Sequence, residues 1–281
     1  MALVPPQFLD CIVAIVLSEQ DKPSSYQWQA TGFLVGRSTQ EIEEDGIPKK
    51  LYTVYLVTNK HVLEEFEEKG NESFVVGFNP HSAEKVGVKI YSGLLVQNGE
   101  RLWTAHNSED VAVTQTNVVL LKEEGRQFEF FRLDENLLSA AKMKSEGVSE
   151  GDFVYVLGYP MGLVDQDWHY PIVRSGSIAR IRDVLEGHRS QFLLDLLNFP
   201  GSSGSPVVTK PESMTIEGTQ PVNKAYVIGI VSGYRRYEEI VESTLTGREV
   251  EVIQNSGLAV SVSSECILET IEEDFKKRRE T

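Results

Sequence analysis

About a dozen short runs of β-branched and aromatic residues, each bounded by turn-forming residues, follow one another along this chain of 281 residues. Val, Ile, Tyr and Phe favour strands, whereas Gly, Asn, Pro and Asp punctuate the sequence between the runs. Strands of this length and spacing are typical of antiparallel sandwiches and barrels. We therefore expect an all-β fold, with strands over residues 11–17, 30–37, 51–59, 73–78, 85–90, 110–116, 152–159, 172–181, 191–197, 206–209, 225–233 and 257–262.

Helical patterns are few. Residues 61–69 predict one or two helical turns after a strand, and residues 264–279 predict a longer C-terminal helix. Ser263 or Ser264 can cap this second helix, and its acidic first half and basic end suit the helix dipole. Its apolar stripe consists of Ile267, Leu268, Ile271 and Phe275.

The charged, weakly periodic stretch 121–148 divides the strand runs into two halves of about six strands each. We predict a first half over residues 8–120, a linker over 121–148, a second half over 149–262 and a terminal helix over 263–281. The two halves and the helix are expected to form one domain, since a chain of this length can bury a sizeable core.

Charge, hydropathy and cysteine content exclude several classes of function. The formal net charge of −15 argues against nucleic acid or an anionic membrane surface as a partner, because neutralising phosphates requires clustered Lys and Arg. The longest apolar run, residues 11–17, is too short to span a bilayer and lacks the flanks of a signal peptide. The two cysteines, Cys11 and Cys266, favour a reducing compartment, most simply the cytoplasm.

Familiar site patterns are absent or out of context. The sequence GVSEG (147–151) matches G-x-S-x-G, but a polar stretch precedes it and a strand follows, which inverts the context of a nucleophile elbow. The five histidines are scattered, with no H-E-x-x-H, C-x-x-C or glycine-rich phosphate loop. Cys11 and Cys266 fall on apolar faces and are interpreted as packing residues. We therefore expect neither a metal nor a cofactor.

Serine chemistry is the remaining candidate, in the segment GSSGSP at residues 201–206. It needs an imidazole that takes the hydroxyl proton, a carboxylate that orients the imidazole, and two N–H groups that bind the oxyanion. Glycines beside Ser203 permit backbone conformations that a side chain would block. The amides of Gly201 and Ser203 are the expected oxyanion donors. Taken alone, such a Gly/Ser segment is more often an ordinary turn.

His61 and Asp110 are the candidate base and orienting acid. His61 follows the apolar run 51–59, and Asp110 opens the run 110–116. Each by itself is typical of a capping or turn residue. The alternative acids are Asp165, Asp167 and Asp195. The first two lack a strand-opening context, and the third is better placed to stabilise the second half.

The order His61, Asp110, Ser203 resembles that of the chymotrypsin-like serine proteases and differs from the order in subtilisins and α/β-hydrolases. The resemblance covers roughly residues 8–275, and each candidate lies in a segment similar to a motif of that family. These segments are TGFLVG (31–36), YLVTNKHVL (55–63), EDVAV (109–113), NFPGSSGSPVV (198–208) and AYVIGIVSG (225–233).

The second half is similar to the bacterial trypsin-like proteases of the high-temperature-requirement (HtrA) kind. The segments that carry this similarity are GDFVYVLGYPMGL (151–163), VRSGSIARI (173–181), Asp195 and GLAVSVSSECILETI (257–271). The resemblance implies two six-stranded antiparallel β-barrels and a C-terminal helix. It also implies a serine endopeptidase that uses Ser203, His61 and Asp110 through an acyl-enzyme, without a cofactor, on a polypeptide substrate.

The sequence departs from the family pattern at two positions near Ser203. Ser202 stands where zymogen-type proteases carry an aspartate, so we expect regulation by a protein partner or by homo-oligomerisation rather than by a freed N-terminus. Leu197 stands where trypsin-like specificity requires a carboxylate, which argues against cleavage after Lys or Arg. The expected pocket for a small or medium apolar side chain is formed by Leu197, Val231, Ser232, Gly233 and Ala259.

The C-terminal third differs from the pattern in two further ways. The insertion 235–251 is expected beside the pocket, where Arg235 or Arg236 offers recognition of an acidic group. The PDZ domain that often follows HtrA-type protease domains is not expected here. The alternative function is a catalytically silent protease-fold module that binds a partner peptide by strand addition along residues 227–233. A subunit whose proteolysis is switched on inside an assembly is a third hypothesis.

Overall fold

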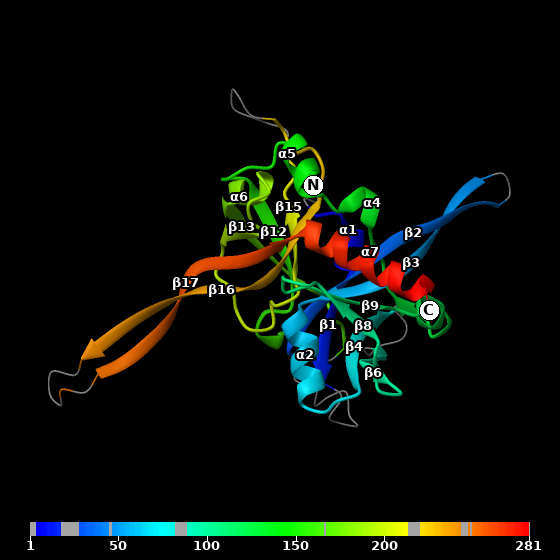
Figure 1. Ribbon diagram of the computed structural model, residues 1–281, viewed down its shortest axis with the longest axis horizontal. Helices are drawn as coiled ribbons and strands as arrows, with labels where there is room; N and C mark the ends of the chain where they lie inside the picture. Colours follow the sequence, from blue (N-terminus) through cyan, green and yellow to red (C-terminus); the bar gives the residue numbers. More distant parts are fainter. Residues whose placement is uncertain are drawn as a thin grey trace.

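The computed structural model describes residues 4–17, 28–44, 47–81, 89–165, 167–212, 220–242, 247 and 249–280. Figure 1 shows two β-structured halves side by side, with a long helix lying across them and two hairpin arms that reach away from the body. The part of the expected strand 85–90 that precedes Lys89 lies outside the described residues.

The N-terminal half is an open sheet of nine strands. Its principal order is β10-β4-β1-β2-β3-β9-β8, with β5 added on β4 and β11 parallel to β2. The strands are β1 (Ile12–Leu17), β2 (Ala30–Glu44), β3 (Ile47–Thr58), β4 (Ser73–Pro80), β5 (Lys89–Leu94), β8 (Trp103–Ala105), β9 (Ala112–Gln115), β10 (Arg126–Gln127) and β11 (Phe131–Arg132).

The closed six-stranded barrel predicted for this half is not seen among the described residues, which form one open sheet. Among the described residues, no strand pairing joins β5 to β8, and β8 is only three residues long. Strand patterning reports which residues alternate in and out, but it does not report whether the first and last strands meet.

The C-terminal half is the six-stranded antiparallel barrel that the resemblance implies. It closes in the order β12-β13-β14-β17-β16-β15. Val154, Leu194, Val207 and Ile228 point into it and are fully buried, as the alternation of apolar residues predicts. The strands are β12 (Phe153–Gly158), β13 (Ile172–Arg180), β14 (Gln191–Asp195), β15 (Pro206–Thr209), β16 (Val227–Glu242) and β17 (Glu249–Ser263).

The segment 121–148, predicted as a linker, is largely ordered and shared by both halves. Its strands β10 and β11 pair with β4 and β2 of the N-terminal sheet. The other short elements of the fold are α1 (Pro6–Leu9), α2 (Lys60–Glu68), β6 (Val96–Gln97), β7 (Glu100–Arg101), α3 (Val118–Glu123), α4 (Leu133–Asn136), α5 (Ala140–Ser145), η2 (Pro160–Gly162) and α6 (Arg182–Leu185).

The predicted C-terminal helix is present as α7 (Ser264–Glu280). It packs against β8 and β9 of one half and against β16 and β17 of the other. Ile267 and Ile271 are fully buried in a core that also contains Phe33 and Ile230, one from each half. Among the described residues, no helix combines the length and apolar character that crossing a membrane requires.

Candidate active site

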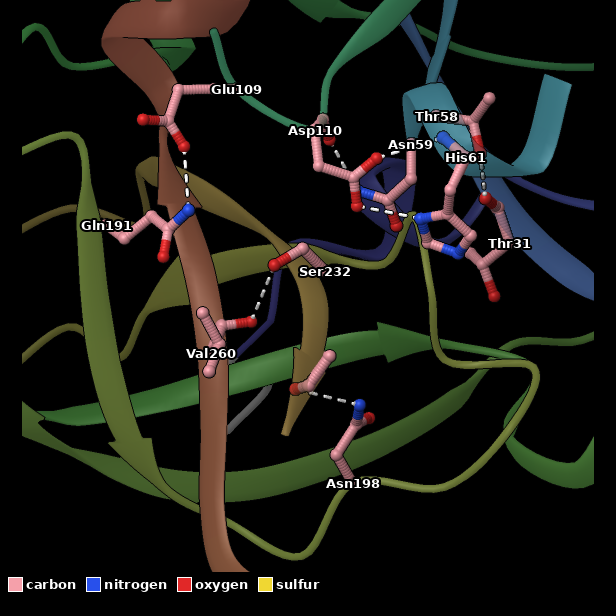
Figure 2. A network of polar contacts seen from close by, with 11 residues as sticks. Thr31, Thr58, Asn59, His61, Glu109, Asp110, Gln191, Asn198, Ser232 and Val260 are labelled. Atoms are coloured by element: carbon pink, nitrogen blue, oxygen red, sulfur yellow. Dashed lines mark hydrogen bonds and ion pairs between the residues drawn. The ribbon is translucent and has the colours of Figure 1, made fainter. Parts of the chain in front are cut away.

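His61 and Asp110 meet at the edge of the N-terminal sheet (Figure 2). His61 lies in the first turn of α2, directly after β3 ends, and Asp110 lies just before β9, the neighbour of β3. The Nδ1 atom of His61 is 2.7 Å from Oδ2 of Asp110, and the His61 amide donates to Oδ1 at 3.0 Å. Asn59 donates from Nδ2 to the Asp110 carbonyl oxygen at 2.8 Å. Both carboxylate oxygens and the backbone of Asp110 are thus fixed by the segment that carries His61.

This pairing sets the charge preference of the imidazole. Burial lowers the pKa of His61, but the hydrogen bond and the negative charge of Asp110, with Glu65 and Glu64 nearby, more than offset it. The net result is a His61 pKa above its usual value of 6.5. Because Nδ1 faces the carboxylate, the ring is oriented with Nε2 away from Asp110 and free to exchange a proton.

The Ser203 loop owes its shape to two glycines in a left-handed conformation. Gly201 and Gly204 both have φ of 87°. A Cβ on Gly201 would lie 2.5 Å from the Tyr159 carbonyl oxygen, and one on Gly204 would overlap the carbonyl oxygen of Thr31. Both positions therefore require glycine for backbone conformation and for space.

Thr31 of β2 anchors this loop to the sheet that carries His61. Its amide donates to the Ser203 carbonyl oxygen at 2.9 Å, and its hydroxyl donates to the Gly201 carbonyl oxygen at 2.8 Å. The Thr31 carbonyl oxygen in turn accepts from the hydroxyl of Thr58, three residues before His61, at 2.8 Å (Figure 2). This role was not predicted, because Thr31 lies within a predicted strand and carries no motif of its own.

Two amides of the Ser203 loop have no acceptor among the residues that the structure describes. Within the part of the chain that the structure describes, neither the Gly201 amide nor the Ser203 amide donates a hydrogen bond. These are the two amides expected to bind an oxyanion. The Ser203 hydroxyl is likewise without a hydrogen bond among the described residues. The structure therefore pairs His61 with Asp110 but does not join Ser203 to His61 by a hydrogen bond, a contact that often tightens only when substrate binds.

Ser202 is enclosed in the same loop. It is buried, its amide donates to the Phe199 carbonyl oxygen at 3.1 Å, and its carbonyl oxygen accepts from the Ser205 amide at 3.0 Å. Backbone hydrogen bonds within the loop thus hold it at Ser202, the position where an ion pair orders the corresponding loop of zymogen-type proteases.

The expected pocket residues divide into two sets. Val231 and Ala259 are fully buried in the core of the C-terminal barrel. Leu197 is 49% exposed, and its carbonyl oxygen accepts a hydrogen bond from Arg174. Ser232 and Gly233 are partly buried, and the Ser232 hydroxyl donates to the Val260 carbonyl oxygen at 3.3 Å.

Asn198 is a site residue that sequence reasoning missed. It is 4% exposed, and its Nδ2 donates to the Gly233 carbonyl oxygen at 3.1 Å (Figure 2). Asn255 donates to the Asn198 carbonyl oxygen at 2.6 Å. Oδ1 of Asn198 is buried without a partner among the described residues. A polar residue inside the apolar run before the Ser203 loop was the available signal.

The alternative acids lie elsewhere. Asp195 belongs to β14 and pairs with β13 and β17, and the Asp167 amide donates to Asp165 at 2.9 Å. Among the described residues, none of these three acids contacts His61. Arg235 and Arg236 are exposed at the base of the β16–β17 hairpin.

His106, Cys266 and Glu269 bring three possible metal ligands within 4.8 Å of one another. Nδ1 of His106 accepts from the amides of Ser108 and Glu109, so the ring proton is on Nε2, which lies 3.0 Å from Glu269. A metal on Nε2 would force that proton onto Nδ1, against both amides. Burial raises the pKa of Cys266 to about 12, which keeps the thiol protonated. The arrangement therefore suits a hydrogen bond between His106 and Glu269 of α7 better than a bound metal ion.

Comparison with known proteins agrees with the geometry. The family model described as a trypsin-like peptidase domain matches residues 30–214, more than half of the chain, and this range includes His61, Asp110 and Ser203. No curated protein matches the chain. Together with the mostly-β architecture and its closed barrel, this match shows that the chain belongs to the trypsin-like peptidase domain family.

Proposed function

We propose that the protein is a serine endopeptidase whose catalytic residues are Ser203, His61 and Asp110. The observation that carries the proposal is the double engagement of Asp110 by the ring and the amide of His61, which leaves Nε2 of the ring unengaged by the acid. The amides of Gly201 and Ser203 support it, because these donors beside the candidate nucleophile have no acceptor in the described part of the chain.

The proposed reaction proceeds in two steps. Ser203 Oγ attacks the scissile carbonyl carbon while Nε2 of His61 takes the hydroxyl proton, and the Gly201 and Ser203 amides stabilise the oxyanion. His61 then gives its proton to the leaving amine, which departs and leaves an acyl-enzyme. Water attacks the acyl carbon in the second step, with His61 again taking and returning a proton.

We further propose that the pocket takes a small or medium apolar side chain. No carboxylate stands at Leu197, so a Lys or Arg side chain would enter without a counter-ion.

The second candidate function is a catalytically silent module that binds peptides by strand addition. The observation that favours it is the absence, among the described residues, of a hydrogen bond from the Ser203 hydroxyl to His61. An enzyme switched on by a partner protein or by homo-oligomerisation shares this resting geometry. The similarity to HtrA-type proteases remains a prediction. A reducing compartment also remains a prediction, and the two free cysteines are in keeping with it.

Labelling with a fluorophosphonate separates these candidates, because the probe reacts with activated serines. We expect labelling of the wild-type protein and of His81→Ala, and loss of labelling in Ser203→Ala and His61→Ala. His81 is a matched control, since its ring lies on an exposed residue away from Asp110. No labelling under any condition, including with candidate partner proteins added, would rule out the endopeptidase.

A further inference from the structure

The hairpin formed by the far ends of β16 and β17 leaves the body of the protein as a free ribbon (Figure 1). We call it the β16–β17 arm and define it as residues 236–242 of β16 and 249–255 of β17. Its strands are paired in regular register from Arg236 with Asn255 to Glu242 with Glu249. A ribbon of two strands is marginally stable in water, so an arm of this kind gains from a further strand.

One edge of the arm is continuous with the strand beside Ser203. The last pairing of β15 with β16 is Pro206 with Ile230, and the Val231 backbone then bonds to Gly204 and Ser205, the two residues after Ser203. The Gly233 carbonyl oxygen accepts from Asn198, and two irregularities interrupt the pairing of β16 with β17 before Arg236. From Tyr234 to Glu242, the edge of β16 that faces away from β17 has no strand partner among the described residues. These nine residues of extended chain span about 30 Å, enough to pair with a long peptide segment.

The register assigns the arm two chemically different faces, because directly paired residues point to the same side. One face carries four glutamates, with Arg236, Asn255 and two isoleucines. Its acidic residues are Glu238, Glu242, Glu249 and Glu251. The other face carries four apolar residues with Glu239 and Gln254. Its apolar residues are Tyr237, Val241, Val250 and Val252.

The apolar face is largely open to solvent. Tyr237 is 53% exposed, Val241 47% and Val250 57%. Apolar side chains on a ribbon with unpaired edges are a liability unless a partner covers them. A partner that fits this edge must therefore pair with its backbone groups, cover the apolar face and carry positive charge for the acidic face.

We propose that the free edge of the β16–β17 arm binds a segment of the substrate polypeptide in which basic and apolar residues alternate. This inference rests on the proposed function. In an added strand, alternate side chains fall on opposite faces, so the basic residues lie on the face of the four glutamates, beside Glu238 and Glu242 of β16, and the apolar ones beside Tyr237 and Val241. Antiparallel pairing is the more stable arrangement and places the C-terminal end of the segment beside Ser203. The arm thus selects residues on the N-terminal side of the cleaved bond.

A second copy of this chain is a poorer occupant of the edge. Two arms paired edge to edge would bring the same glutamates onto a shared face, and like charges placed opposite one another destabilise a sheet. A basic segment removes that repulsion.

Binding of a defined peptide tests this without relying on catalysis. Ser203→Ala is titrated against the fluorophore-labelled peptide KVKTKVKTKV, and anisotropy reports the affinity. We expect binding that weakens as salt is raised, and no binding of EVETEVETEV. In the Ser203→Ala background, Glu238→Gln with Glu242→Gln should weaken binding about fivefold. The matched control, Glu41→Gln with Glu43→Gln, makes the same charge change on the exposed β2–β3 hairpin and should leave affinity unchanged.

Methylated peptides test the pairing itself. N-methyl groups are placed on all odd or on all even residues of KVKTKVKTKV. In strand addition, alternate residues turn their N–H groups toward the arm, so one series should bind at least about tenfold more weakly than the other. Three outcomes would each overturn the proposal. These are equal affinities of the two methylated series, equal losses in the arm variant and its control, and an arm-dependent dimer on gel filtration. Because Ser203 is absent throughout, failure here is distinct from failure of fluorophosphonate labelling.

Discussion

The amide of Thr31 donates to the carbonyl oxygen of Ser203 at 2.9 Å, which makes a strand of the N-terminal sheet the support of the candidate nucleophile. The Thr31 hydroxyl adds two contacts, donating to the Gly201 carbonyl oxygen and accepting from the Tyr159 amide at 3.0 Å. The loop with the serine belongs to one half of the fold, and its support belongs to the other. Thr31 therefore helps to position the two halves relative to each other.

Replacing Thr31 with Val should destabilise the protein and slow its labelling by a fluorophosphonate. The substitution keeps the shape but leaves the Gly201 carbonyl oxygen and the Tyr159 amide buried and unpaired, at about 1–3 kcal/mol each. Urea unfolding measures the loss. Thr39→Val is the control, because the Thr39 hydroxyl donates to Leu51 at an exposed position, and its effect should stay within about 0.5 kcal/mol. Equal effects of both variants would contradict this role.

The raised pKa of His61 predicts the acid side of the pH profile. The protonated imidazole cannot act as a base, so the fluorophosphonate labelling rate of wild type should fall as the pH is lowered, with a midpoint above pH 6.5. Asp110→Asn removes the largest interactions that raise this pKa, so the midpoint should move to lower pH while the plateau falls by about 10⁴-fold, as for the equivalent change in the type case of the triad. The labelling rate is measured from about pH 5 to pH 9. Asp165→Asn should change neither quantity, and an unmoved midpoint in Asp110→Asn would show that the pair is not coupled.

Two glycine substitutions separate backbone strain from lack of space. Gly204→Ala and Gly187→Ala both place a side chain at positive φ, which costs about 1–2 kcal/mol. Nothing lies within 4 Å of a Cβ on Gly187, whereas one on Gly204 meets a Thr31 carbonyl oxygen that Thr58 holds in place. Gly204→Ala should therefore lose about 3 kcal/mol or more in thermal or urea unfolding, and Gly187→Ala much less. Similar losses would show that the loop can shift.

His169 predicts an acid-dependent loss of stability. It is buried against Trp28, and burial, partly offset by Asp165, lowers its pKa from 6.5 to about 4. Between pH 6.5 and pH 4, the unfolded chain binds a proton at His169 that the folded protein does not bind. The free energy of unfolding is therefore highest above pH 6.5, where His169 is neutral in both states. It should fall toward pH 4 by on the order of 3 kcal/mol.

Two histidine variants check this assignment by urea unfolding across the same pH range. His169→Gln should flatten the dependence, because the titrating group is gone. His188→Gln, at an exposed residue, should leave it as in wild type. If His169→Gln retained the full slope, the titrating group would lie elsewhere.

Runs of β-branched and aromatic residues bounded by turn residues predicted the position of the strands well, including β4 and β15, which are buried along most of their length. The same pattern says nothing about closure, so the short strand β8 and the open N-terminal sheet were not foreseen. It also missed the length of the arms, since Ile240 and Ile253 alternate like core residues yet lie in solvent.

The resemblance to the chymotrypsin-like order of His61, Asp110 and Ser203 implied the pairing of His61 with Asp110, and the structure brings the two together. Asn198 and Thr31 could not be found in this way. Their importance comes from tertiary hydrogen bonds to Gly233 and Gly201, and no spacing in the sequence encodes such contacts.

The helix α7 also bears on the order of events during synthesis. Its Ile267 and Ile271 fill the core between the halves, and its buried Asp274 accepts from Thr104 of β8 at 2.7 Å. A ribosome makes α7 after every strand of both halves. A nascent chain therefore carries Ser203 and His61 before it carries the helix that packs against both halves.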